Sequence, residues 1–316
     1  MLGDEDMEIL YLNPVFKQMI WGGSRMREEY GYDIPGDNTG ECWVVSAHPQ
    51  GDGTIASGEY AGKKLSELFE EKRELFGNIQ GDRFPLLTKI IDAESDLSIQ
   101  VHPDDAYARV HENGSLGKME CWYILDCKED ATIVIGHHAK TRQELEDMVK
   151  EARWKELIRE IPIKKGDFFQ INPGCVHAIK GGTMILETQQ NSDITYRLYD
   201  YDRLQDGKRR SLHIKQSLDV IKVPFEEVRQ EAGENRTSND WFEQLITCEY
   251  YTIWKAELKG TKKLVQDQKF LIGSVIDGAA VMDGRQIKKG EHFIIPAGMK
   301  DVLLEGEASF IFSAVS

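Results

Sequence analysis

Residues 164–177 read KKGDFFQINPGCVH and residues 288–301 read KKGEHFIIPAGMKD, so the chain carries nearly the same segment twice. Each copy has a Lys-Lys-Gly turn, a short apolar run and a corner with Pro and Gly. The copies end differently, on His177 in the first and on Asp301 in the second. Glycine and proline predict the turns, and the apolar run between them predicts a strand. We therefore expect two related β units, of which only the first ends on an imidazole.

Strand and turn signals also dominate the rest of the sequence. Runs such as ECWVVSAH, LSIQVH, ECWYILDC and TIVIGHH are separated by Gly, Pro, Asn and Asp, which is typical of a β-sandwich or barrel. Three segments have helical spacing instead, and they begin near Leu65, at Thr141 and at Ile214. The segment 229–240, RQEAGENRTSND, has almost nothing to bury and is predicted to link two domains.

The repeated segment resembles the second signature of the cupin jelly roll, which is a turn, a strand, a Pro/Gly corner and a histidine. This resemblance implies a mainly β fold with two cupin (jelly-roll β-barrel) domains, residues 1–235 and 236–316, and a few helices attached to the first. In cupins the histidine after the corner is a metal ligand. Because Asp301 replaces it and no H-x-H lies upstream in the second half, the resemblance implies a metal-binding catalytic first domain and a metal-free C-terminal domain.

The composition restricts the class of partner. Asp and Glu number 54 against 39 Lys and Arg, and the net charge of -15 argues against nonspecific binding to nucleic acid or to anionic membranes. An anionic small substrate would need a local cluster of Lys and Arg. No run is long and apolar enough for a membrane helix, and the acidic start MLGDEDMEIL is unlike a signal peptide, which predicts a cytoplasmic location. The composition leaves the oligomeric state open.

Candidate metal ligands lie on predicted strands before His177. In LSIQVHPDD, Gln100 and His102 are two residues apart, so both side chains point to one face of a strand. In GKMECWYIL, Lys118 and Glu120 have the same spacing. Two imidazoles, one carboxylate and one amide oxygen suit a divalent ion such as Zn²⁺ with one position left for water or substrate. The remaining six histidines lack such neighbours and are expected in loops or on the surface: His48, His111, His137, His138, His213 and His292.

Two strand-like runs follow His177, and they contain Glu187 and Arg197. An arginine on a strand is most often a solvated or ion-paired edge residue. Because this strand follows the strand of His177 closely in the chain, the alternative is that Arg197 projects into the same barrel. There its planar guanidinium could hold a phosphate or a developing oxyanion.

Four motifs in this order, LSIQVHPDD, K-x-E in GKMEC, NPGCVHAI and SDITYRLYDYDR, resemble type I mannose-6-phosphate isomerases of the short bacterial form. The likeness spans the chain and includes IWGG at 20–23 and ECW at 41–43. It implies metal ligands at Gln100, His102, Glu120 and His177, an active-site arginine at Arg197, and pocket positions at Trp21, Glu41, Lys89, Lys118 and Glu187. Longer members have a histidine immediately before the lysine of K-x-E, a candidate proton carrier, where this chain has Gly117.

The resemblance implies an aldose–ketose isomerase that interconverts mannose 6-phosphate and fructose 6-phosphate through a cis-enediol, with one zinc per chain. Lys118 or Glu187 would carry the proton, Arg197 would stabilise the oxyanion, and Lys89 and Arg203 would contact the phosphate. One alternative is a cupin dioxygenase with iron or copper, although such sites usually have three histidines. Another is a bicupin that binds a sugar phosphate without turnover.

Overall fold

The computed structural model describes residues 7–227, 240–299 and 301–316, and the chain divides into two compact units. One unit comprises the described parts of Met1–Val15, Trp43–Thr88 and Gln230–Ser316, and the other comprises Phe16–Cys42 and the described part of Lys89–Arg229. The two predicted domains, 1–235 and 236–316, differ from this division because two early segments group with the C-terminal one. Strand pairing explains the difference, since β1 (Leu10–Asn13) pairs with β22 (His292–Ile295) and with β6 (Thr54–Ile55). The predicted linker, apart from Asp240, lies outside the described residues.

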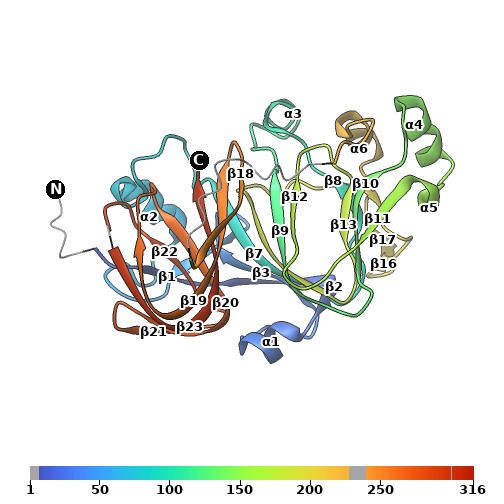
Figure 1. Ribbon diagram of the computed structural model, residues 1–316. Helices are drawn as coiled ribbons and strands as arrows, with labels where there is room; N and C mark the ends of the chain where they lie inside the picture. The colour runs from blue at the N-terminus through green and yellow to red at the C-terminus, as the bar shows by residue number, and fades with distance from the viewer. Residues whose placement is uncertain (1–6, 228–239, 300) are drawn as a thin grey trace. The chain divides into compact units, whose positions relative to one another are not determined.

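Two sheets enclose the core of the unit formed by 16–42 and 89–229 (Figure 1). The five-stranded sheet has the order β11 (Ile158–Pro162), β10 (Thr132–His137), β13 (His177–Ile179), β8 (Ile99–Val101), β15 (Tyr196–Tyr199). The six-stranded sheet has the order β12 (Phe168–Ile171), β9 (Glu120–Cys127), β14 (Thr183–Gln190), β7 (Leu86–Ala93), β2 (Val15–Gly23), β3 (Thr39–Val45). Ile133 and Ile179 of the first sheet pack in one apolar cluster with Trp122 and Ile185 of the second. The mainly β cupin prediction is confirmed in this two-sheet form.

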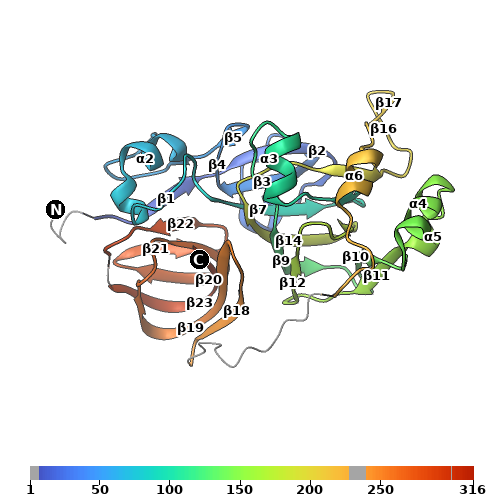
Figure 2. The ribbon, with the colours of Figure 1, turned by 90° about the horizontal axis from the view of Figure 1, so that it is seen from above.

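Helices pack on the outer face of the five-stranded sheet. Here α4 (Arg142–Lys150), α5 (Trp154–Leu157) and α6 (Ile214–Val220) contribute to a second apolar cluster that includes Leu145, Val134 and Leu198. Figure 2 shows α4 and α5 beside β10 and β11. The three predicted helices are confirmed as α2 (Leu65–Glu71), α4 and α6. Two others, α1 (Arg25–Tyr30) and α5, are shorter than these, and α3 (Asp105–His111) is as long as α2 but buries only Ala108, so its periodic pattern is weak.

The other unit is built on one eight-stranded sheet. Its order is β18 (Phe242–Thr247), β19 (Tyr251–Val265), β23 (Asp301–Val315), β20 (Leu271–Met282), β22, β1, β6, and β21 (Arg285–Lys288) pairs with β20. The short elements β4 (Ala47–His48), β5 (Gly51–Asp52), α2 and η1 (Arg73–Phe76) complete it. The prediction that only strands follow the linker is confirmed for the described residues. Within the described ranges, no helix is long and apolar enough to cross a membrane.

The glycines of the repeated segment have the same conformation in both copies. The glycines of the two Lys-Lys-Gly turns, Gly166 and Gly290, both have φ of 90°, and those of the corners, Gly174 and Gly298, have φ of 84° and 87°. A side chain other than glycine is disfavoured at such angles, so the repeated glycines have a structural cause. The two endings differ, because His177 is fully buried whereas Asp301 is 46% exposed and pairs with Lys263 at 2.6 Å. The second copy thus keeps the turn and corner and directs its last side chain to solvent.

The expectation that the remaining histidines lie in loops or on the surface is wrong for two of them. His137 ends β10, and His292 begins β22; each is 4% exposed. Each stands at the end of a strand beside a polar residue, His138 or Glu291, so the local pattern does not reveal that the histidine is buried. The Nδ1 atom of His292 lies 2.8 Å from Ser274 Oγ.

The folding stability should therefore depend on pH through His292. Burial lowers its pKa to about 3, whereas the unfolded value is about 6.5. The stabilising contribution of the neutral ring is complete above pH 6.5 and is lost as pH falls toward 3. Between pH 7.5 and 5.5 we expect wild type to lose about 1.4 kcal/mol more than His292→Asn, measured by urea unfolding of both proteins. Equal losses of stability in the two proteins would show that His292 does not cause this pH dependence.

Candidate functional site

The corner of the first repeat places His177 in the interior between the two sheets. The residue begins β13, and its Nδ1 lies 2.9 Å from the Cys175 carbonyl. His102, which follows β8, is held in the same way, with its Nδ1 2.7 Å from the Ile194 carbonyl. A ring nitrogen beside a carbonyl carries the proton, so the Nε2 atom of each ring keeps a lone pair.

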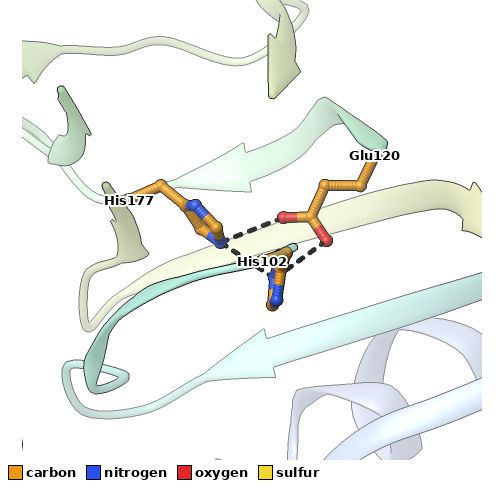
Figure 3. Close-up of side chains that lie close together, drawn as sticks. All are labelled: His102, Glu120 and His177. Carbon is orange, nitrogen blue, oxygen red and sulfur yellow. Dashed lines mark hydrogen bonds and ion pairs between the residues drawn. The ribbon is translucent and has the colours of Figure 1, made fainter. Parts of the chain in front are cut away.

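These two lone pairs meet a carboxylate from the opposite sheet. Glu120 begins β9 and is fully buried, and its Oε1 and Oε2 lie 3.2 Å from His177 Nε2 and 3.5 Å from His102 Nε2 (Figure 3). The two Nε2 atoms are 3.1 Å apart. Two imidazole lone pairs and a carboxylate that converge in this way fit a divalent cation with N and O ligands such as Zn²⁺.

Gln100 lies beside this cluster. It stands directly opposite His177 across β8 and β13, and opposite residues of an antiparallel pair point to one face. Its Nε2 is 3.4 Å from His177 Nε2. The two ends of an amide are assigned from their neighbours, and the reverse orientation would direct Gln100 Oε1 at the same point. The residue is therefore placed to be a fourth ligand through its amide oxygen.

Lys118 is buried against the cluster. Its Nζ lies 2.5 Å from Glu120 Oε2 and donates a hydrogen bond of 3.1 Å to His102 Nε2. Burial lowers the pKa of Lys118, but the carboxylates Glu120 and Glu187 outweigh burial and raise it above its usual value. The lysine is thus a charged donor at neutral pH and a poor proton acceptor.

Glu187 lies on β14 of the same sheet as Glu120 and has a different electrostatic setting. It is 2% exposed, and burial, followed by the charge of Glu120, raises its pKa to about 7. Trp122 donates its indole N–H to Glu187 Oε1 at 3.0 Å, and Lys89 Nζ lies 3.5 Å from Oε2. Lys89 is also 3.7 Å from Glu41, so the lysine stands between two carboxylates. A carboxylate with a pKa near 7 is suited to exchanging a proton with a substrate.

Trp21 is placed differently from these polar residues. It lies on β2, is 3% exposed and belongs to the apolar cluster between the sheets. A Cβ atom at Gly40 would lie 2.6 Å from the Trp21 ring, so the indole packs against backbone there. The described contacts of Trp21 are those of a core residue.

Arg197 points to the same face as Gln100 and His177. It stands opposite Gln100 across β15 and β8, so the three side chains form one row over three strands. A β-bulge follows, because Tyr199 pairs with Ile99 and is thereby sent to the opposite face. Burial, followed by the charge of Arg210, lowers the pKa of Arg197 below its usual value. Of the two sequence interpretations of Arg197, this arrangement favours the one in which it shares a face with the proposed metal ligands.

Arg203 is fixed by residues outside this row. It pairs with Asp200 at 2.6 Å, donates to the Asp96 carbonyl and lies over the Tyr201 ring. Asp200 also accepts from Arg210, at 2.8 and 2.5 Å. Asp200 and Arg210 were not recognised as site residues from the sequence, although the dense charges in DYDRLQDGKRR at 200–210 could have indicated a charged cluster.

The position before Lys118, which is Gly117 in this chain, has no room for a side chain. A Cβ atom there would lie 2.4 Å from the carbonyl carbon of Asp104 and 2.5 Å from the Asp105 nitrogen. The Gly117 N–H donates to Asp105 Oδ1 at 2.6 Å. Backbone atoms fill the space that any side chain would need, so a histidine side chain would displace the loop that carries Lys118.

We expect Gly117→Ala to lower the free energy of unfolding by about 1–3 kcal/mol, the usual cost of overpacking. Any activity that depends on Lys118 should fall with it because Lys118 would move. Urea unfolding and an activity assay measure the two effects. Ser115→Ala, a nearby change that adds no atom, should alter neither. Unchanged unfolding of Gly117→Ala would mean that the loop has room for a side chain.

Residues 9–116 match the family model of the type I phosphomannose isomerase catalytic domain, and residues 242–315 match that of the mannose-6-phosphate isomerase cupin domain. The chain is 49% identical to mannose-6-phosphate isomerase ManA of Bacillus subtilis over 97% of this chain and 98% of that one. It is 44% identical to a mannose-6-phosphate isomerase of Streptococcus mutans over 97% and 98% of the two chains. The crystal structure of a mannose 6-phosphate isomerase from Bacillus subtilis has 46% identity and a TM-score of 0.93, covering 97% and 99% of the two chains.

Proposed function

Because the chain belongs to the type I mannose-6-phosphate isomerase family, we propose that it interconverts mannose 6-phosphate and fructose 6-phosphate through a cis-enediol, with one zinc ion per chain. The observation that carries the proposal is the convergence of His102, Glu120 and His177 beside the buried groups Lys118 and Glu187. His102, Glu120 and His177 would hold the zinc, with Gln100 as the fourth ligand. A zinc ion bound there supplies a Lewis acid that polarises the sugar carbonyl.

Glu187 is the residue we assign to proton transfer. The aldose-to-ketose direction removes a proton from C2 and delivers one to C1, so one group must accept and then donate it. A carboxyl group with a pKa of about 7 is present in both protonation states near neutral pH. Lys118 stays charged, because its pKa is raised, and is assigned to donating hydrogen bonds to the sugar oxygens. Arg197 stabilises the negative charge that the enediolate gains when the C2 proton leaves.

Of the substrate contacts predicted from the sequence, the structure supports some more strongly than others. Lys89 and Glu41 adjoin Glu187 and are proposed to bind sugar hydroxyls. Trp21 is buried in the apolar cluster, so it would support the wall of the pocket and would not contact the substrate through a polar group. Both Nη atoms of Arg203 bond to protein groups, which weakens its assignment to the phosphate. A cytoplasmic location and the absence of nucleic-acid and membrane partners stay predictions.

The test is a coupled assay of mannose 6-phosphate conversion with metal analysis of the same preparation. Isomerase activity with about one zinc per chain would support the proposal. Oxygen consumption with iron or copper would instead indicate a dioxygenase. Tight binding of the sugar phosphate without turnover would indicate a binding protein.

A further inference from the structure

A cluster of arginines surrounds one buried carboxylate next to the proposed active site. Asp200 is 4% exposed and accepts from both Arg210 and Arg203, and its neighbour Arg197 has its pKa lowered by burial and then by the charge of Arg210. Two guanidinium groups thus bond to this carboxylate, and a third, that of Arg197, lies within range of its charge. In a chain with a net charge of -15, this is the local positive excess that an anionic substrate requires.

The backbone that carries this cluster is constrained. Arg203 N–H donates to the Asp200 carbonyl at 3.1 Å, and the two residues between them, Tyr201 and Asp202, have φ of 57° and 55°. Positive φ is uncommon for a bulky residue such as tyrosine. The turn keeps Asp200 and Arg203 together and is followed by the short hairpin of β16 (Leu204–Gln205) and β17 (Lys208–Arg209), which returns Arg210 to Asp200.

The three arginines differ in the donors that they leave unused. Both Nη atoms of Arg203 bond to protein groups. Arg210 bonds Asp200 through Nε and Nη2, and its Nη1 makes no hydrogen bond to a described residue. Arg197 bonds the Ser211 carbonyl through Nη1 at 3.0 Å. Arg210 and Arg197 therefore keep donors for a ligand.

Arg197 and Arg210 lie at different places relative to the metal cluster, which suggests different roles. Arg197 stands opposite Gln100, and Gln100 stands opposite His177, so Arg197 is one strand spacing of about 4.8 Å from the strand of Gln100 and two from the strand of His177. Arg210 comes from the hairpin beyond that row and adjoins Arg197. If C1 and C2 of a hexose phosphate lie at the metal cluster and its carbon chain runs past Arg197, the phosphate would lie on the side of Arg210.

We infer that Arg210, positioned by Asp200, binds the phosphate group of the substrate, in place of Arg203, which the sequence had suggested. The inference rests on the proposed function for the identity of the sugar phosphate. Guanidinium is suited to this task because its planar fork matches phosphate oxygens. Asp200 fixes Nε and Nη2, which leaves Nη1 directed away from the carboxylate and free to donate.

Arg210→Ala should raise the Michaelis constant for mannose 6-phosphate about 10- to 100-fold, the range for a lost charge-assisted hydrogen bond, and change kcat much less. The inhibition constant of inorganic phosphate should rise by a similar factor. Asp200→Asn should shift both constants in the same direction by less. Arg209→Ala is the matched control, because Arg209 is adjacent, its side chain is 70% exposed, and its one ion pair with a described residue is to Asp202 at 3.1 Å. This variant should change neither constant.

Arg210→Gln, measured together with circular dichroism, gives the same comparison if the alanine variant fails to fold. A fall in kcat with an unchanged Michaelis constant would overturn the inference and assign Arg210 to the chemical step. Unchanged kinetics and unchanged phosphate inhibition would overturn it as well. If wild type lacks isomerase activity, the proposed function fails, and calorimetric titration of inorganic phosphate into wild type and Arg210→Ala still decides the subsite.

Discussion

His177→Ala is expected to lose bound zinc and isomerase activity together while the protein stays folded. The metal-assisted step depends on a cation worth several kcal/mol of transition-state stabilisation, so activity should fall on the order of 10³-fold or more. The fold should persist because the apolar cluster between the sheets does not depend on this imidazole. Metal analysis, the coupled assay and circular dichroism measure the three properties on one preparation.

The repeat supplies a matched control for this variant. Asp301 occupies the equivalent position after the second corner, is 46% exposed and pairs with Lys263. Asp301→Ala should therefore leave the zinc content and the activity unchanged. A His177→Ala protein with about one zinc per chain and normal turnover would show that His177 is not a ligand. Loss of zinc from Asp301→Ala would show that the second unit contributes a metal site.

The parts of the site that follow from local pattern could be predicted from the sequence. Alternation along a strand places Gln100 and His102 on one face, and the repeated corner identifies where His177 enters the interior. These predictions depend on residues a few positions apart, where the geometry of a strand or turn is fixed. The confirmed helices depend on periodicity over two turns in the same way.

Features that depend on pairing between distant segments could not be predicted in this way. The bulge after Arg197 sends Tyr199 to the opposite face, whereas strict alternation would keep the two residues on one face. Asp200 and Arg210 are brought together by a hairpin. The short strand β1 joins a sheet whose long strands lie more than two hundred residues later in the chain. Gly117 is ordinary in the sequence, and only the approach of the Asp104 backbone shows why a glycine is needed there.

Arg197→Lys should lower kcat on the order of 10²- to 10³-fold with zinc content intact and a much smaller change in the Michaelis constant. The row of His177, Gln100 and Arg197 places this guanidinium on the same face as the proposed metal ligands. A contact to charge that develops as the C2 proton leaves is stronger in the transition state than in the ground state, so its loss appears in kcat. Lysine keeps the charge, but it loses the planar fork and the hydrogen bond to the Ser211 carbonyl that orients it.

Steady-state kinetics on Arg197→Lys, with metal analysis, separate this role from the one inferred for Arg210. The two variants should show opposite signatures, since Arg197 acts on the rate and Arg210 on the binding of the phosphate. If Arg197→Lys turns over normally and only binds the sugar phosphate more weakly, Arg197 is a second phosphate contact, and the charge of the enediolate must be stabilised by Lys118. If neither constant changes, Arg197 is an edge residue of β15 with no part in the reaction, and the row over three strands has only a structural role.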